Sequence, residues 1–202
     1  MVYRFMFVGY TEDVNSVKIV SDSNCYVALS YKDKKVYMYV ESNHEYVEPD
    51  LLVEGGLLQY PGGNRWERAN EIFHYSKPIK DEQWRRKVGN KRPHIMVNKL
   101  KPEMVSRYIF YHYQYQEEVP GDGDRYGIIF LQGQDLIFYL EEPTENETER
   151  LKGELNTSHT PISQWQELMG EHFADCWRDI DVLEFSQYCG FNYEHGKSII
   201  NN

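Results

Sequence analysis

Two stretches of the chain, YVALSYKDKKVYMYVES (residues 26–42) and YGIIFLQGQDLIFYLEE (residues 126–142), share one pattern. Each begins with tyrosine, runs through residues that favour β-strands, turns at a polar segment (32–35 or 132–135) and ends in glutamate. The pattern predicts a β-hairpin with a four-residue loop in each stretch. Corresponding positions lie 100 residues apart throughout, which indicates a duplicated unit.

The segments that flank the two hairpins also correspond to each other. Residues 4–10 and 93–100 are short apolar stretches that predict a strand before each hairpin. Residues 66–76 and 177–186 each join a tryptophan to a further apolar strand after the hairpin. The duplication therefore extends beyond the hairpins to a strand on either side.

The second half also has room for two helices. Apolar side chains recur at intervals of three and four in residues 101–118, where Pro102 suits the first helical turn, and residues 163–173 are amphipathic too. The predicted order β-α-β-β-α-β is that of the ferredoxin-like fold. In the first half only residues 11–25 precede the hairpin, so its first helix is expected to be short or missing, and residues 50–60 are expected to supply the second.

A ferredoxin-like sheet has one face covered by helices, so its other face must be buried on something else. A second copy in the same chain can cover it. We therefore predict an α+β protein in which tandem ferredoxin-like repeats form an intrachain dimeric α/β-barrel. The expected organisation is a degenerate ferredoxin-like repeat (1–76), a linker (77–92), a second ferredoxin-like repeat (93–186) and a C-terminal extension (187–202).

Composition excludes several classes of function. The formal net charge of −10 argues against nucleic-acid binding, which needs clustered Lys and Arg. Cys25, Cys176 and Cys189 form an odd set without metal-like spacing, which fits a reducing cytoplasm. No apolar run approaches membrane-spanning length, and no His-x-His or His-x-x-x-His pair occurs. We expect a cytoplasmic protein without a metal, a cofactor or a membrane or nucleic-acid partner.

Strand alternation predicts which side chains share a face of the second hairpin. If Leu131 pairs with Leu136, Ile128 lies opposite Tyr139, and side chains two apart point the same way. One face then carries Tyr126, Tyr139 and Glu141, and the first half repeats this set as Tyr26, Tyr39 and Glu41. Charged residues at strand ends are often only solvated, so both a binding role and a solvated position stay open for each glutamate.

The segment RYIFYHYQYQEE (107–118) places five aromatic residues and one histidine in the predicted helix. Tyr108 and His112 are four residues apart, so they share a helix face. A histidine with an ordinary pKa of about 6.5 can take and give a proton near neutral pH. A histidine in an aromatic helix is also a common packing residue, and the spacing leaves both roles open.

Residues 93–186 resemble the L-rhamnose mutarotases, small dimeric α/β-barrel proteins that interconvert sugar anomers without a cofactor. The resemblance rests on Pro102, Tyr108 and His112 at intervals of six and four, on the tyrosine that begins the hairpin, Tyr126, and on Trp165 in SQWQELM. Two departures concern the site. Gln166 stands where that family carries a second tryptophan, and the segment between His112 and Tyr126 is shorter.

The resemblance implies an acid–base mechanism that opens and recloses a pyranose ring. It implies His112 as the acid/base, assisted by Tyr108, in a cavity that also contains Tyr126 and a stacking wall at Trp165. The tyrosine hydroxyls and Glu141 would bind the sugar hydroxyls, which gives as substrate-binding residues Tyr126, Trp165, Tyr139 and Glu141. The enzyme class implied is an isomerase of the aldose 1-epimerase type (a mutarotase) in carbohydrate metabolism, with a small-molecule sugar as its partner.

Two alternatives to the mutarotase hypothesis stay open. One is a non-catalytic module whose barrel binds a small ligand or a protein, which the degenerate first half and the missing tryptophan favour. The other is a cofactor-free oxygenase of the same barrel class. A fold alone does not choose among these functions, and a homodimer is compatible with each of them.

Overall fold

The computed structural model of the chain describes residues 2–20, 25–75, 91–118, 124–145, 164–176, 180–192 and 197–201. These residues form mostly antiparallel β-sheet with few helices, which agrees with the predicted α+β class. The chain divides into two compact units. Unit 1 comprises Met1–Asn70, Pro78–His94 and Leu183–Asn202, and unit 2 comprises Glu71–Lys77 and Ile95–Val182.

The sheet of unit 1 contains the strands predicted for the first half. They are β1 (Tyr3–Tyr10), β3 (Cys25–Lys32), β4 (Lys35–Ser42) and β6 (Trp66–His74), and their order is β6-β1-β4-β3. Residues 71–74 of β6 belong to unit 2. Beyond β3 the sheet continues with β11 (Gln187–Asn192) and β12 (Lys197–Asn201). The predicted C-terminal extension therefore adds an antiparallel hairpin to this unit.

The predicted first helix of this half is short, as expected, and the predicted second helix is absent. In place of the first helix the described residues contain only the 3₁₀ turn η1 (Val14–Ser16). In place of the second they contain the 3₁₀ turn η2 (Pro49–Leu51) and a two-residue strand, β5 (Val53–Glu54). Strand β5 pairs with β2 (Lys18–Ile19). Gly55 has φ +128°, and a Cβ atom there would lie 2.1 Å from the carbonyl oxygen of Ser16. The prediction of a helix over 50–60 was wrong because this close approach requires glycine in a non-helical conformation.

Unit 2 has the element order predicted for the second half. Its strands are β7 (Arg92–Lys99), β8 (Ile128–Gln132), β9 (Asp135–Glu142) and β10 (Asp181–Glu184), in the order β10-β7-β9-β8. A 3₁₀ turn, η4 (Pro102–Met104), leads into α1 (Val105–Glu118), and α2 is Trp165–Gly170. The second helix is shorter than predicted, because the chain turns after Gly170 and pairs Phe173 with Leu100.

The two hairpins have the same register. Lys32 pairs with Lys35 and Gln132 pairs with Asp135, and the pairing continues through equivalent positions along both hairpins. The predicted pair of Leu131 with Leu136 is confirmed. The loops are shorter than predicted, because the outer two residues of each four-residue segment already belong to the ladder. Each turn begins with a positive φ, at Asp33 and Gly133, as two-residue hairpin loops require.

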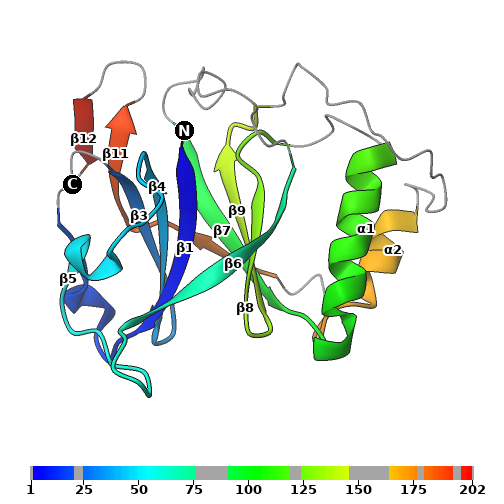
Figure 1. Cartoon of the computed structure of the whole chain (residues 1–202), viewed down its shortest axis with the longest axis horizontal. Coiled ribbons are helices and arrows are strands. Elements are labelled where there is room, and N and C mark those ends of the chain that lie inside the picture. Colours follow the sequence, from blue (N-terminus) through cyan, green and yellow to red (C-terminus); the bar gives the residue numbers. More distant parts are fainter. Residues whose placement is uncertain are drawn as a thin grey trace. The chain divides into compact units, whose positions relative to one another are not determined.

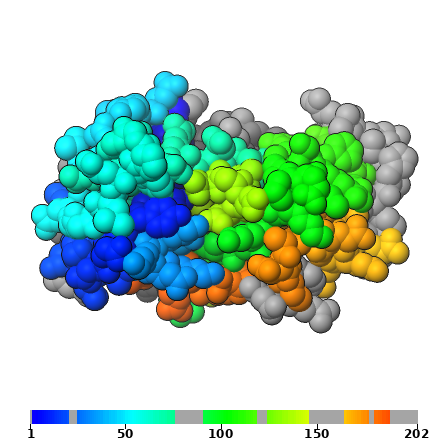
Figure 2. Space-filling view, turned by 90° about the horizontal axis from the view of Figure 1, so that it is seen from below, coloured from blue at the N-terminus to red at the C-terminus, as the bar shows by residue number. Residues whose placement is uncertain are grey.

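Helices α1 and α2 lie side by side in unit 2 (Figure 1), and their surfaces adjoin in the space-filling view, where α1 is green and residues 164–176 are orange (Figure 2). Beneath them lies an apolar core that includes Phe73, Leu100, Tyr108, Ile129, Leu136, Met169 and Phe173. The helices thus cover the sheet face on which Ile129 and Leu136 project. No helix in the described part of the chain has the length and apolar character needed to cross a membrane.

The predicted linker, residues 77–92, lies outside the described residues except for its last two positions. Lys91 is described, and Arg92 is the first residue of β7.

Candidate functional site

His112 lies in a group of aromatic rings between α1 and the sheet of unit 2. Its side chain is 3% exposed, and its ring centroid lies 4.1 Å from that of Tyr108, 5.1 Å from Trp165 and 5.2 Å from Phe73. The ring of His172 also lies against that of Tyr108, with ring centroids 5.9 Å apart. We call this group, Phe73, Tyr75, Tyr108, His112, Trp165 and His172, the aromatic–histidine cluster.

Backbone hydrogen bonds determine the tautomers of the two histidines. The Nδ1 atom of His112 lies 2.9 Å from the carbonyl oxygen of Tyr108, and that of His172 lies 2.9 Å from the carbonyl oxygen of Leu168. A carbonyl oxygen only accepts, so in both rings Nδ1 carries the proton and Nε2 keeps its lone pair. The Nε2 atom of His172 is buried and has no hydrogen-bond partner among the described residues.

Burial keeps this cluster uncharged at neutral pH. Desolvation lowers the pKa of His112 from its usual 6.5 to about 4, with a smaller lowering from His172, and the pKa of His172 is lowered too, chiefly by burial. Burial also raises the pKa of Tyr108 well above 10. The cluster therefore presents neutral imidazoles beside a protonated phenol, and its rings meet largely edge to face, as in aromatic cores.

The structure does not gather all six sequence-predicted site residues into one cavity. His112, Tyr108 and Trp165 meet on the sheet face that α1 covers, where Ile129 and Leu136 project. Tyr139 pairs directly with Ile128, so both point to the opposite face, which Glu141 shares two residues later. Tyr126 is fully buried and is not part of the core beneath the helices.

The separation follows from strand alternation. The expectation of a shared cavity assumed that the helix face with residues 108 and 112 packs beside the hairpin's first tyrosine. That helix face instead packs on the alternate residues of β8 and β9, so the sheet itself separates the two groups.

The two hairpins each hold a buried tyrosine–glutamate pair. The hydroxyl of Tyr139 donates to Oε1 of Glu141 at 2.6 Å, and the hydroxyl of Tyr39 donates to Oε1 of Glu41 at 2.8 Å. Both glutamates are 1% exposed, so neither has the solvated position that was one of the two alternatives for it. In unit 1 the carboxylate of Glu41 also lies 3.6 Å from the guanidinium of Arg4. Because these side chains are removed from water, each glutamate depends on its hydrogen-bond and charge partners inside the protein.

Unit 1 contains a groove that the sequence did not indicate. It has a volume of about 240 Å³ and is open to solvent. Its walls come from Phe5 and Phe7 of β1, from residues 46–50 around η2 and from residues 64–66 and 68 at the start of β6. We call it the Trp66 groove.

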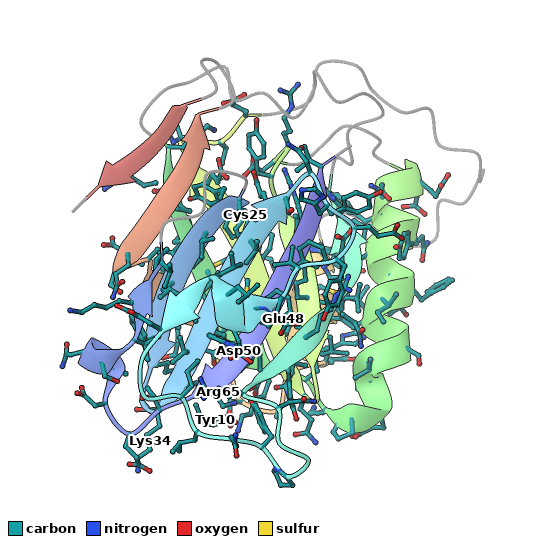
Figure 3. The ribbon with its side chains drawn as sticks, turned by 60° about the vertical axis from the view of Figure 1, so that its left-hand side comes forward. Tyr10, Cys25, Lys34, Glu48, Asp50 and Arg65 are labelled. Atoms are coloured by element: carbon teal, nitrogen blue, oxygen red, sulfur yellow. The ribbon has the colours of Figure 1, made fainter. Side chains whose placement is uncertain are left out.

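Side chains of both charges line the Trp66 groove. Figure 3 labels Glu48 and Asp50, from the segment around η2, and Arg65, from the turn before β6, on the side of the unit that faces the viewer. Arg68 completes the set, and its guanidinium lies 4.7 Å from the centroid of the Phe5 ring. Within the described part of the chain, no ion pair joins these four side chains to each other or to other residues.

Trp66 also lines this groove, and its indole N–H lacks a partner. The residue is 6% exposed, and among the described residues no acceptor lies within hydrogen-bonding distance of Nε1. The edge of the indole with Cε3 and Cζ3 faces Gly9, its partner across β1 and β6, so Nε1 points away from Gly9. A buried N–H donor without an acceptor lowers the stability of the folded state, so such donors are rare in proteins.

The groove residues come from three segments that are far apart in the sequence, which is why sequence patterns did not single them out. The one local signal is NRWER (64–68), in which arginines surround a tryptophan in front of a strand. The described residues contain no group of three His, Cys, Asp or Glu side chains arranged to hold a metal ion. Comparisons with protein-family models, with curated proteins and with solved structures found no match to this chain.

Proposed function

We propose that the chain consists of tandem ferredoxin-like repeats that form an intrachain dimeric α/β-barrel. The identical strand orders β6-β1-β4-β3 and β10-β7-β9-β8 support this architecture. The shared hairpin register and the matched pairs Tyr39–Glu41 and Tyr139–Glu141 support it further. Two buried tyrosine–glutamate pairs at the same offset are more simply explained by duplication than by independent origin.

We propose that this protein binds a small ligand without catalysis, in the Trp66 groove. The observation that carries the proposal is that side chains of both charges line this groove without an ion pair among the described residues, together with Trp66, whose indole N–H is buried and unpartnered there. Ligand sites combine an apolar lining with a few placed polar groups, and Phe5, Phe7 and Val47 supply the apolar part here. A ligand with complementary groups would form ion pairs with charged side chains that form none among the described residues.

Binding also agrees better than catalysis with the surroundings of His112. General acid–base catalysis favours a group whose pKa lies near the working pH, and burial lowers the pKa of His112 to about 4. The ring is enclosed by Tyr108, Trp165 and Phe73 and by its hydrogen bond to the helix backbone. These contacts are those of a packing residue.

A thermal-shift screen of small molecules tests the binding function. We expect some members of a chemically diverse library to raise the melting temperature of the wild-type protein, since a ligand that binds only the folded state stabilises it. Arg65→Ala should abolish the shifts, whereas Lys34→Ala, which removes an exposed cation of the same unit outside the groove, should leave them unchanged. Hits that stabilise wild type and Arg65→Ala equally would place the ligand elsewhere.

Sugar mutarotation is the second candidate function, and one observation favours it. Tyr108, His112 and Trp165 do meet, as the resemblance to the L-rhamnose mutarotases implies. At neutral pH the Nε2 atom of His112 would serve as the base and the protonated hydroxyl of Tyr108 as the acid, in a site that admits a sugar after the cluster opens.

Saturation-transfer NMR on rhamnose, fucose and galactose separates the two candidates. The binding proposal predicts that no sugar exchanges its anomers faster with the protein than in buffer. Mutarotation predicts an acceleration that falls by roughly 10²–10⁴-fold in His112→Ala, the typical contribution of an acid–base group. Such a result would replace the binding proposal.

We also propose a cytoplasmic location for the protein. The support is that Cys176 is a free thiol, as is usual in reducing compartments.

A further inference from the structure

The Trp66 groove separates its charges by segment. The anionic side chains, Glu48 and Asp50, come from the segment around η2, and the cationic ones, Arg65 and Arg68, come from the start of β6. Within the described residues, no ion pair joins the two sets of side chains. The groove is therefore complementary to a small molecule that carries one charge of each sign.

The cationic side is prepared for a carboxylate. Arg68 pairs with Phe7 across β1 and β6, and its guanidinium lies over the ring of Phe5, a cation–π contact that restricts its position. A guanidinium presents its donors in a planar fork that matches the two oxygens of a carboxylate. Trp66 and Arg68 are two residues apart on one strand, so they share a face, and both line the groove.

The anionic side is prepared for an ammonium group. The hydroxyl of Tyr46 donates to Oε2 of Glu48 at 2.8 Å, which orients that carboxylate while its other oxygen remains available. Asp50 lies in η2, two residues further along the same wall. Two carboxylates provide the acceptors that the three N–H bonds of an ammonium group require.

The size of the groove limits the ligand. Pockets for drug-sized molecules have volumes of about 300–1,000 Å³, and this groove has about 240 Å³. Phe5, Phe7 and Val47 also line the groove and offer apolar surface to a short aliphatic side chain. The small volume, the charges of both signs and the apolar surface match a free amino acid better than a sugar, because a neutral sugar has no charged group to pair with them.

We propose that the Trp66 groove binds a small zwitterion, an apolar α-amino acid, with its carboxylate at Arg65 and Arg68 and its ammonium group at Glu48 and Asp50. This proposal rests on the proposed binding function and names the class of ligand for it. Because the charged side chains are exposed and screened by solvent, the expected dissociation constant for a single amino acid is about 1 mM.

Titrations with L-leucine and two blocked analogues test this ligand class on the full chain. N-acetyl-L-leucine lacks the ammonium group and L-leucine amide lacks the carboxylate. We expect L-leucine to bind to the wild-type protein, measured by ¹H–¹⁵N NMR, at least about tenfold more tightly than either analogue, since each analogue leaves one charged wall unpaired. Arg68→Gln should remove the preference for leucine over its amide, and Asp50→Asn should reduce the preference over the acetylated form.

Lys34→Gln is the matched control, because Lys34 is exposed, pairs with Glu12 and does not line the groove. It should bind leucine as the wild type does. Equal affinities for leucine and both analogues, or unchanged selectivity in Arg68→Gln and Asp50→Asn, would overturn the zwitterion proposal. If the screen above yields Arg65-dependent ligands that are not zwitterions, the ligand class fails and the binding function stands. If no compound depends on the groove, both fail.

Discussion

Lowering the pH from about 7.5 to about 4 is expected to reduce the free energy of unfolding by about 3 kcal/mol through His112 alone. In the unfolded chain this histidine takes up a proton near its ordinary pKa of 6.5, whereas burial lowers the pKa in the folded protein to about 4. The unfolded state therefore binds more protons between these values. The stability from His112 is complete above pH 6.5, decreases as the pH falls and is lost below about pH 4.

Urea denaturation at several pH values measures this effect. His112→Gln has no titrating ring, so the decrease between pH 6.5 and 4 should be smaller than in the wild type by the amount that His112 contributes. His172 adds a decrease in the same direction, because burial lowers its pKa as well, so some acid sensitivity should remain. His44→Gln is the matched control, since His44 is exposed, and it should behave as the wild type. An unchanged pH dependence in His112→Gln would show that this ring is hydrated in the folded state.

Glu41→Ala is expected to reduce the free energy of unfolding by about 3–5 kcal/mol, the usual cost of removing one partner of a buried ion pair. The side chains of Arg4 and Glu41 are 2% and 1% exposed, with 3.6 Å between Nη2 and Oε1. Removing the carboxylate leaves the guanidinium of Arg4 without this compensating charge in a dehydrated place. The hydroxyl of Tyr39 also loses its acceptor, Oε1 of Glu41.

Urea denaturation at neutral pH compares Glu41→Ala with two other variants. Glu12→Ala removes an exposed partner of Lys34, so it should cost less than about 1 kcal/mol. The double variant Arg4→Met, Glu41→Leu removes both charges and should recover much of the stability that Glu41→Ala loses. If Glu41→Ala costs no more than Glu12→Ala, the Arg4–Glu41 pair is not buried in solution.

Local features were the ones that the sequence predicted correctly. The hairpin register followed from the match between residues 26–42 and 126–142, because alternation in a strand depends only on neighbouring residues. Helix α1 followed from apolar spacing, and Pro102 begins the 3₁₀ turn η4 that leads into it. The loop lengths were wrong because the polar residues Lys32 and Gln132 belong to the ladder, and polarity alone does not distinguish a strand end from a turn.

The candidate sites depend on contacts between segments that are distant in the sequence, and the sequence pattern did not predict those contacts. Tyr108 and His112 were correctly placed on one helix face together, but the face of the sheet that receives them depends on how α1 packs. That packing separates them from Tyr139. The Trp66 groove combines three segments, and no periodic pattern connects β1, residues 46–50 and residues 64–68.

The indole N–H signal of Trp66 in a ¹H–¹⁵N NMR spectrum gives the most direct test of ligand binding in the groove. The signal can be assigned by its absence from Trp66→Phe, and it would be followed while a stabilising compound from the screen is added. The account predicts that the Trp66 signal shifts, because the indole lines the groove that the ligand enters, while the Trp165 signal stays in place. A shift of the Trp165 signal with Trp66 unchanged would contradict the account and place the ligand at the aromatic–histidine cluster.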